Sequence, residues 1–165
     1  MSSRPTARWC ADGIPAMPTP TPSFRELTHD ECIAVLDRHQ VGRLAFTQRD
    51  RLDIEPIHYV YLGGWIYGRT QPGTKLEVLL HNRWVAFEVD EVDALFDWRS
   101  VVVRGGLYLL RAEGSDDERA RYAQGVAAVR RLVPEAFTPD DPTPERAILF
   151  RIHVDELSGR AATTG

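Results

Sequence analysis

Residues 52–70 read LDIEPIHYVYLGGWIYGRT, and this stretch decides the fold class. On both sides of the glycine pair, apolar and polar residues alternate with a period close to two, which is typical of strands. Gly63 and Gly64 can both adopt the positive φ that a tight turn between antiparallel strands requires. The stretch therefore predicts a β-hairpin with strands at 52–62 and 65–70.

Four further segments predict strands because β-branched and aromatic residues are concentrated in them, at 41–47, 84–90, 100–110 and 147–154. The long third segment contains Gly105 and Gly106, which mark a candidate β-bulge. Together with the hairpin, these segments give six strands.

Three segments carry apolar residues at helical spacing instead. Thr28 and Ser115 are each followed three residues later by a glutamate, a capping-box pattern that predicts helix starts there. A shorter helix is expected at 74–81. Because short turns join most strands and helices do not alternate with them, we expect a mainly β fold, a six-stranded antiparallel barrel with flanking helices.

The composition is that of one globular domain. The chain has 165 residues, with 20 Lys and Arg against 24 Asp and Glu, a net charge of −4. Prolines crowd the first residues, so we expect a disordered tail at 1–23 and a folded domain at 24–165. The negative charge argues against a nucleic-acid partner, and no apolar run approaches the roughly 20 residues of a membrane span. With two cysteines and no export-signal pattern, a cytoplasmic protein is expected.

The first strand-to-helix connection collects groups that bind anions. It reads YGRTQPGTK at residues 67–75, so that Arg69 and Thr70 end the strand while Thr74 and Lys75 fall in the first turn of the helix. Backbone N–H groups, hydroxyls and positive charges therefore gather in one place. The spacing is not that of a P-loop, and no GxGxxG follows a strand, which disfavours nucleotide triphosphate chemistry. The alternative is an ordinary connection with a solvated lysine.

Before the long strand stands the tripeptide Trp98–Arg99–Ser100. A tryptophan beside a guanidinium can stack on a planar ligand or donate hydrogen bonds to it. The alternative is a tryptophan that covers one end of the barrel.

Pro56 lies inside the strand at 52–62, where it cannot donate a ladder hydrogen bond. We therefore expect an edge or an interruption there, with backbone groups free for a ligand. His58, two residues on, could donate a proton, ligate a haem iron or be a structural histidine.

No pattern typical of nucleophilic catalysis or of metal binding stands out. The histidines have no mutual metal-ligand spacing, and no Ser/His/Asp or Cys/His set can be singled out. We expect neither a catalytic side chain nor a metal site.

Seven segments, in order along 27–160, resemble the pyridoxamine 5′-phosphate oxidase-like FMN-binding split-barrel family, in the branch related to nitroimidazole-resistance flavoproteins. They are VGRLAF at 41–46, PIHY at 56–59, IYGRT at 66–70, GTK at 73–75, VAFEVD at 85–90, WRSVVVRG at 98–105, and FRI at 150–152 with SGR at 158–160. The resemblance implies a Greek-key split β-barrel that forms a homodimer with two FMN molecules at the subunit interface.

In this family three groups of residues surround the flavin. They match Arg69, Thr70, Thr74 and Lys75 at the phosphate, Ile57, His58 and Tyr59 at the isoalloxazine edge, and Trp98, Arg99 and Ser100 from the partner subunit. The paired basic residues that bind substrate phosphate in true pyridoxamine phosphate oxidases have no clear match near the C-terminus, which argues against vitamin B6 oxidation.

The expected function is that of an FMN-dependent oxidoreductase that moves electrons from a reduced nicotinamide to a small planar acceptor, nitroaromatic or quinone-like. The flavin itself would carry the redox chemistry. The alternatives are a non-catalytic flavin- or haem-binding carrier or sensor of the same fold, and a reductase that uses the deazaflavin cofactor F420.

Overall fold

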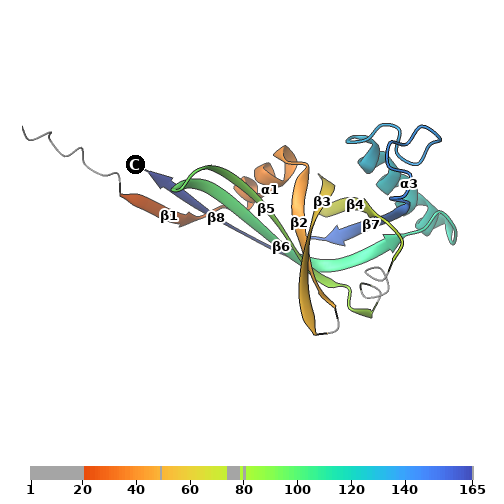
Figure 1. The fold of residues 1–165 in the computed structure, drawn as a ribbon, viewed down its shortest axis with the longest axis horizontal. Coiled ribbons are helices and arrows are strands. Elements are labelled where there is room, and N and C mark those ends of the chain that lie inside the picture. Colours follow the sequence, from red (N-terminus) through yellow and green to blue (C-terminus); the bar gives the residue numbers. More distant parts are fainter. Residues whose placement is uncertain (1–20, 49, 74–78, 80, 165) are drawn as a thin grey trace, which may run out of the picture.

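The computed structural model describes residues 21–48, 50–73, 79 and 81–164. Strands dominate this part of the chain (Figure 1). The elements are β1 (Pro22–Glu26), α1 (His29–Arg38), β2 (Val41–Gln48), β3 (Arg51–Leu62), β4 (Trp65–Thr70), β5 (Trp84–Ala94), β6 (Asp97–Leu110), α3 (Asp116–Arg130), β7 (Ile148–His153) and β8 (Glu156–Thr164).

Six of these strands form a closed antiparallel ring, in the order β2, β3, β4, β7, β6, β5 and back to β2. They are the six strands that the sequence predicts. The expectation of a mainly β, six-stranded antiparallel barrel with flanking helices is therefore confirmed.

Two strands that the sequence did not predict extend the ring into an arm. β8 pairs with the first half of β6, from Trp98 to Arg104, and β1 pairs with β8. In Figure 1 these strands, with the adjoining ends of β5 and β6, project away from the ring on the side opposite α3. β1 begins at Pro22, inside the range assigned to the tail, while residues 1–20 of that tail lie outside the described part.

The long strand β6 belongs to both the arm and the ring because it changes partner at its centre. Up to Arg104 it pairs with β8, and from Leu107 it pairs with β7. Gly105 and Gly106 lie at this change, and both keep regular pairing with β5. The predicted bulge at these glycines is wrong; the irregularity in the β5–β6 pairing lies between Val92 and Ala94.

The turn and helix-start predictions are confirmed. Gly63 and Gly64 have φ values of 56° and 83°, as a tight hairpin turn requires. Thr28 and Ser115 cap α1 and α3, and each accepts a hydrogen bond from the backbone N–H of the glutamate three residues on. Of the predicted helix at 74–81, residues 74–78 and 80 lie outside the described part.

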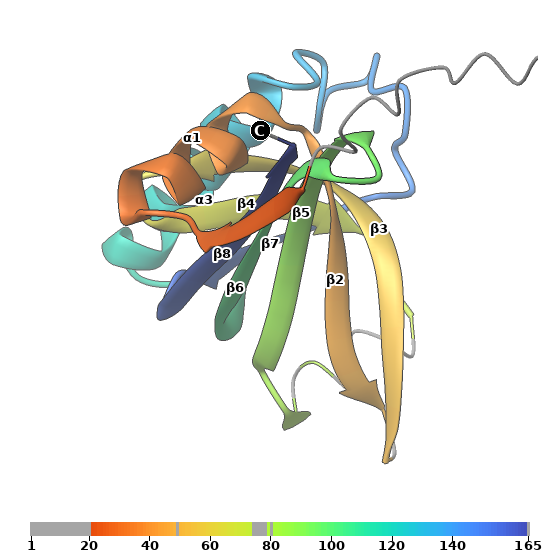
Figure 2. The ribbon, with the colours of Figure 1, turned by 90° about the vertical axis from the view of Figure 1, so that its left-hand side faces the viewer.

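Two clusters of buried side chains hold the fold together. The larger fills the ring and continues under α1 through Val35 and Leu36, while the smaller lies beneath α3 and includes Tyr67 and Leu149. Figure 2 shows the β2–β3 hairpin reaching away from both helices. Within the described ranges, none of the helices has the length and apolar character that a bilayer crossing requires.

Candidate functional site

A cavity opens where β3 and β4 part from each other. β3 pairs with β4 from Tyr59 onward, whereas among the described strands its residues before Tyr59 pair only with β2. Pro56 thus lies where one edge of β3 has no strand partner, as its missing N–H predicts. The cavity, of about 290 Å³, is lined by Glu55, Pro56, Ile57, Arg69, Thr70, Gln71, Pro72, Gly73 and Arg146.

Arg69 forms the rigid wall of this cavity. Its side chain is 7% exposed, and its two terminal nitrogens donate to the Asp141 carboxylate at 2.5 and 3.0 Å. It also donates to the Thr143 hydroxyl at 2.8 Å and lies over the Phe137 ring. The guanidinium lowers the pKa of Asp141 well below its usual range, assisted by backbone N–H groups. Arg69 is therefore held in one orientation with its charge partly balanced by a carboxylate.

A second, more apolar cavity adjoins the first. It has a volume of about 310 Å³ and shares Arg69 and Arg146 with the first cavity. Its lining comes from the residue before β2, from β3 and β4, and from the end of α3 with the loop that follows. The lining residues are Gln40, His58, Tyr59, Val60, Tyr67, Gly68, Arg69, Val129, Leu132, Val133, Pro142, Thr143 and Arg146. The Tyr67 hydroxyl is buried and has no hydrogen-bond partner among the described residues. We call the two cavities together the β3–β4 cleft.

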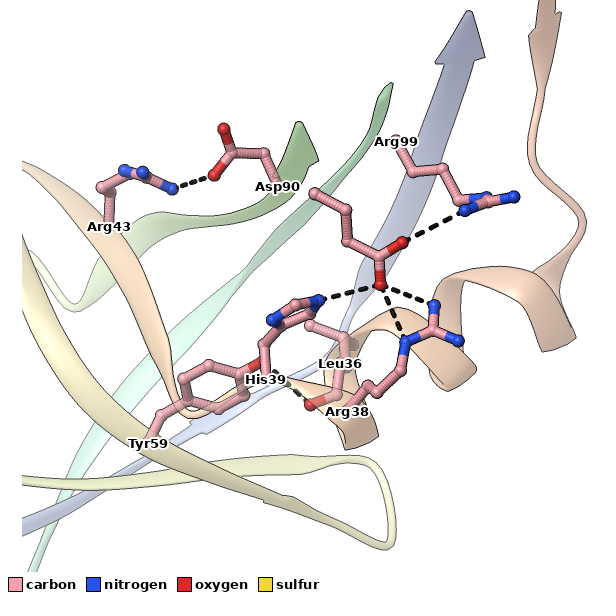
Figure 3. A network of polar contacts seen from close by, with 8 residues as sticks. Leu36, Arg38, His39, Arg43, Tyr59, Asp90 and Arg99 are labelled. Carbon is pink, nitrogen blue, oxygen red and sulfur yellow. Dashed lines mark hydrogen bonds and ion pairs between the residues drawn. The ribbon is translucent and has the colours of Figure 1, made fainter. Parts of the chain in front are cut away.

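Strand alternation sends the predicted edge residues in different directions. Ile57 and Tyr59 are buried, whereas His58 between them is exposed and lines the second cavity. The Tyr59 ring packs edge-on against Phe87 at 4.9 Å, and its hydroxyl donates to the Leu36 carbonyl at 2.8 Å (Figure 3). Burial raises the pKa of Tyr59, so the hydroxyl stays protonated. The Tyr59 hydroxyl thus serves to join β3 to α1.

This role predicts a loss of stability in Tyr59→Phe. The substitution leaves the buried Leu36 carbonyl without its donor, and we expect a loss of about 0.5–1.5 kcal/mol, or roughly 1–6 °C in Tm. Tyr61→Phe is the matched control, because Tyr61 lies on the same strand and its hydroxyl forms no hydrogen bond with another described residue. Thermal melting of both variants checks this; equal shifts would contradict a specific role of the Tyr59 hydroxyl.

The tripeptide Trp98–Arg99–Ser100 lies in the arm and not in the β3–β4 cleft. Trp98 packs against Phe24 of β1, with ring centroids 6.3 Å apart. Trp98 and Ser100 line a separate cavity along β8 and β6, and the Ser100 hydroxyl donates to Glu88 at 2.9 Å. Within one chain, the structure therefore does not bring this group together with Arg69.

Arg99 belongs to a charged network centred on Glu91 of β5 (Figure 3). One carboxylate oxygen of Glu91 accepts from Arg38 at 2.5 and 2.8 Å and lies 2.8 Å from a ring nitrogen of His39; the other accepts from Arg99 at 3.3 Å. Burial alone would raise the pKa of Glu91, but the hydrogen bonds from these three residues outweigh it and lower the pKa. The network ties the end of α1 to the arm and orients Arg99.

Glu91→Gln is therefore expected to destabilise the protein in a pH-dependent way. Because the pKa of Glu91 is lowered in the folded state, its charge contributes fully above pH 4.5, the ordinary value, and the contribution disappears as the pH falls through the folded-state pKa. At neutral pH we expect a loss of about 1–2 kcal/mol, or roughly 2–8 °C in Tm. Melting curves of the wild type and of Glu91→Gln from pH 7 to pH 3 test this. A difference in Tm that stays constant down to pH 3 would show that the carboxylate charge is irrelevant.

Of the predicted phosphate residues, the structure brings Arg69 and Thr70 together in the first cavity, whereas Thr74 and Lys75 lie outside the described residues. Sequence reasoning missed Arg146, which lines both cavities, and Asp141, which fixes Arg69. No local pattern could have found them, since Asp141 is 72 positions away from Arg69.

Comparison with known proteins identifies the family. The sequence profile described as pyridoxamine 5′-phosphate oxidase matches residues 28–161, and the chain belongs to this family. An FAD-binding protein from Mesorhizobium loti has a similar structure, with 29% identity, a TM-score of 0.68 and coverage of 86% of this chain and 99% of that chain. A conserved protein of unknown function from Corynebacterium diphtheriae is 33% identical, with a TM-score of 0.61 and coverage of 85% and 98%. An FAD-binding protein from Mycobacterium smegmatis, 24% identical over 82% of this chain and 98% of its own, shares the fold with a TM-score of 0.58.

Proposed function

We propose that this chain binds FMN in the β3–β4 cleft and acts as an oxidoreductase, moving electrons from a reduced nicotinamide to a small planar acceptor such as a nitroaromatic or a quinone. The observation that carries the proposal is the juxtaposition of a polar cavity, walled by Arg69, with a more apolar one along the open edge of β3. The FAD-binding relative from Mesorhizobium loti supports a flavin. We propose FMN in place of FAD because the polar cavity, with Arg69 and Thr70, suits a single phosphate group.

The residues of the cleft fit such a group. Arg69 and Thr70 would face the phosphate, together with Thr74 and Lys75 from the segment outside the described residues. The backbone edge of β3 around Ile57 and His58, which has no strand partner among the described residues, would meet the polar rim of the isoalloxazine. The buried Tyr67 hydroxyl, which lacks a partner among the described residues, is a further hydrogen-bonding group for the ligand.

Bound FMN would supply the hydride and electron transfer itself. The chain binds and orients: Arg69, fixed by Asp141 and Thr143, presents a preorganised positive charge, which loses little entropy on binding. The apolar side chains of the second cavity, such as Val129 and Val133, would exclude water from the face of the isoalloxazine.

We propose further that the functional unit is a homodimer in which Trp98, Arg99 and Ser100 of one protomer complete the flavin site of the other. This assignment is supported by their place in the arm, away from the cleft of their own chain. A two-fold axis would then give two equivalent composite sites.

Identification of the ligand released from purified protein tests the cofactor. We expect a yellow protein that releases FMN on denaturation, detected by mass spectrometry, and that is bleached by reduced nicotinamide and reoxidised by a quinone or nitroaromatic acceptor. Release of FAD, haem or a deazaflavin would overturn the FMN assignment. FMN without bleaching would instead favour a carrier or sensor.

A heterodimer of two damaged chains tests the shared site. Lys75→Ala and Arg99→Ala homodimers should each have two weakened sites, whereas their heterodimer contains one site with both residues intact. Co-expression with two affinity tags should recover about one tightly bound FMN per dimer. Two equally weak sites in the heterodimer would contradict the composite arrangement.

A further inference from the structure

A separate cavity lies at the other end of the ring from the arm, between the end of β6 and the start of α3. It has a volume of about 280 Å³ and shares no lining residue with either part of the β3–β4 cleft. Four arginines line it: Arg83, Arg111, Arg121 and Arg151. No part of the proposed flavin function uses this cavity.

Its charge is unbalanced. Among the described lining residues, Glu118 is the one carboxylate. Its Oε2 already accepts from the backbone N–H of Ser115 at 2.8 Å and from the Ser115 hydroxyl at 2.9 Å, as part of the cap of α3. Arg111 and Arg121 line the same cavity as Glu118, and their charges help to lower its pKa after these hydrogen bonds. One capping carboxylate cannot neutralise four guanidinium groups.

Two of the arginines are held in place by aromatic rings. The Arg151 guanidinium carbon lies 3.7 Å from the centroid of the Trp65 ring, and that of Arg83 lies 5.2 Å from the centroid of Tyr108. The Nε of Arg151 is buried and has no acceptor among the described residues. A guanidinium that stacks on a ring by its face keeps its N–H groups available for hydrogen bonds. Because buried donors in proteins are normally hydrogen-bonded, the Nε of Arg151 indicates a missing acceptor in this cavity.

We propose that this cavity binds a small organic phosphate monoester. Converging guanidinium groups match the several acceptor oxygens and the double negative charge of a phosphate. The apolar floor of Leu107 and Leu109, with Tyr108 at the side, gives room for the organic part of the ligand. Arg111 and Arg121 would hold the phosphate from one side and Arg151 from the other.

Calorimetry on the flavin-loaded protein tests the proposal, with phenyl phosphate as the probe. We expect saturable binding of one molecule per chain, tighter than that of inorganic phosphate or of benzoate. Arg121→Gln should weaken binding of phenyl phosphate about 10-fold or more, since it removes a charged hydrogen bond. Arg119→Gln is the matched control, because Arg119 lies on the same helix but pairs with Asp116 and does not line the cavity. The affinity of Arg119→Gln for phenyl phosphate should equal that of the wild type. The flavin content of both variants should not change.

Three outcomes would overturn the proposal. Absence of saturable binding would show that the arginines are balanced within the protein. Equal weakening in Arg119→Gln would reveal a diffuse electrostatic effect. Benzoate binding as tightly as phenyl phosphate would rule out recognition of a phosphate. None of these results depends on whether the β3–β4 cleft turns over a substrate.

Discussion

Arg69→Met is expected to bind FMN about 10- to 150-fold more weakly than the wild type and to melt at a lower temperature. The affinity falls because a charged donor at the wall of the cleft is lost. It falls further because the Asp141 carboxylate, 3% exposed, is then left without its partner beside the ligand phosphate. The same unpaired carboxylate lowers the stability. Fluorescence titration with FMN and thermal melting measure the two effects.

The double variant Arg69→Met with Asp141→Leu separates these effects. Removing both charges eliminates the unpaired buried carboxylate, so most of the lost Tm should return, whereas FMN affinity should stay low. If FMN affinity also returns, Arg69 serves only to neutralise Asp141 and does not contact the ligand.

The pH dependence gives an independent check on the same pair. In the wild type the pKa of Asp141 is lowered, so the pair stabilises the fold above the ordinary value of 3.8 and this contribution is lost as the pH falls through the folded-state pKa. In Arg69→Met the burial of an unpaired carboxylate raises its pKa instead. The gap in Tm between the two proteins should therefore narrow as the medium is acidified. A gap that widens would contradict this account.

The ring of six strands could be predicted because its signals are local. Alternation within 52–62 and 65–70, and the two glycines between them, depend on neighbouring residues alone. β8 gives no such signal, since it reads ELSGRAATT, with small and polar residues. Its extended conformation comes from pairing with β6 on one side and β1 on the other, and the buried Ala161 and Ala162 are small enough to fit there.

In the candidate site too, the residues that lie close together in the sequence could be predicted, and those that are distant in the sequence could not. Arg69 and Thr70 belong to one contiguous segment, so their proximity follows from the sequence, and the structure places both in one cavity. The partners that orient Arg69 could not be predicted. Asp141, in a proline-rich loop, reaches it because α3 folds back over β4 and β7. Tyr59 lines the second cavity, where its place in the motif leads us to expect a ligand contact. That its hydroxyl also joins β3 to α1 could not be predicted, because Leu36 belongs to a different element.

The change of partner along β6 requires a glycine at position 105. A Cβ built at Gly105 would lie 1.8 Å from the His153 carbonyl oxygen and 2.9 Å from an Asp155 carboxylate oxygen. Neither group can move away easily. The chain after His153 is held by hydrogen bonds from the Val154 N–H to the Gly64 carbonyl at 3.0 Å and from the Asp155 N–H to the Arg104 carbonyl at 3.1 Å.

Gly105→Ala is therefore expected to lose at least about 3 kcal/mol of stability, at or above the upper end of ordinary overpacking, or roughly 6–12 °C in Tm. Gly73→Ala is the matched control: a Cβ there meets no atom of the described residues within 4 Å, and we expect a change below about 0.5 kcal/mol. Both variants are melted after removal of any bound flavin, because Gly73 lines the β3–β4 cleft. Steric exclusion also predicts that Gly105→Ser is no better tolerated than Gly105→Ala. A Gly105→Ala protein that melts within 2 °C of the wild type would mean that β6 and the end of β7 are not packed this tightly where the arm leaves the ring.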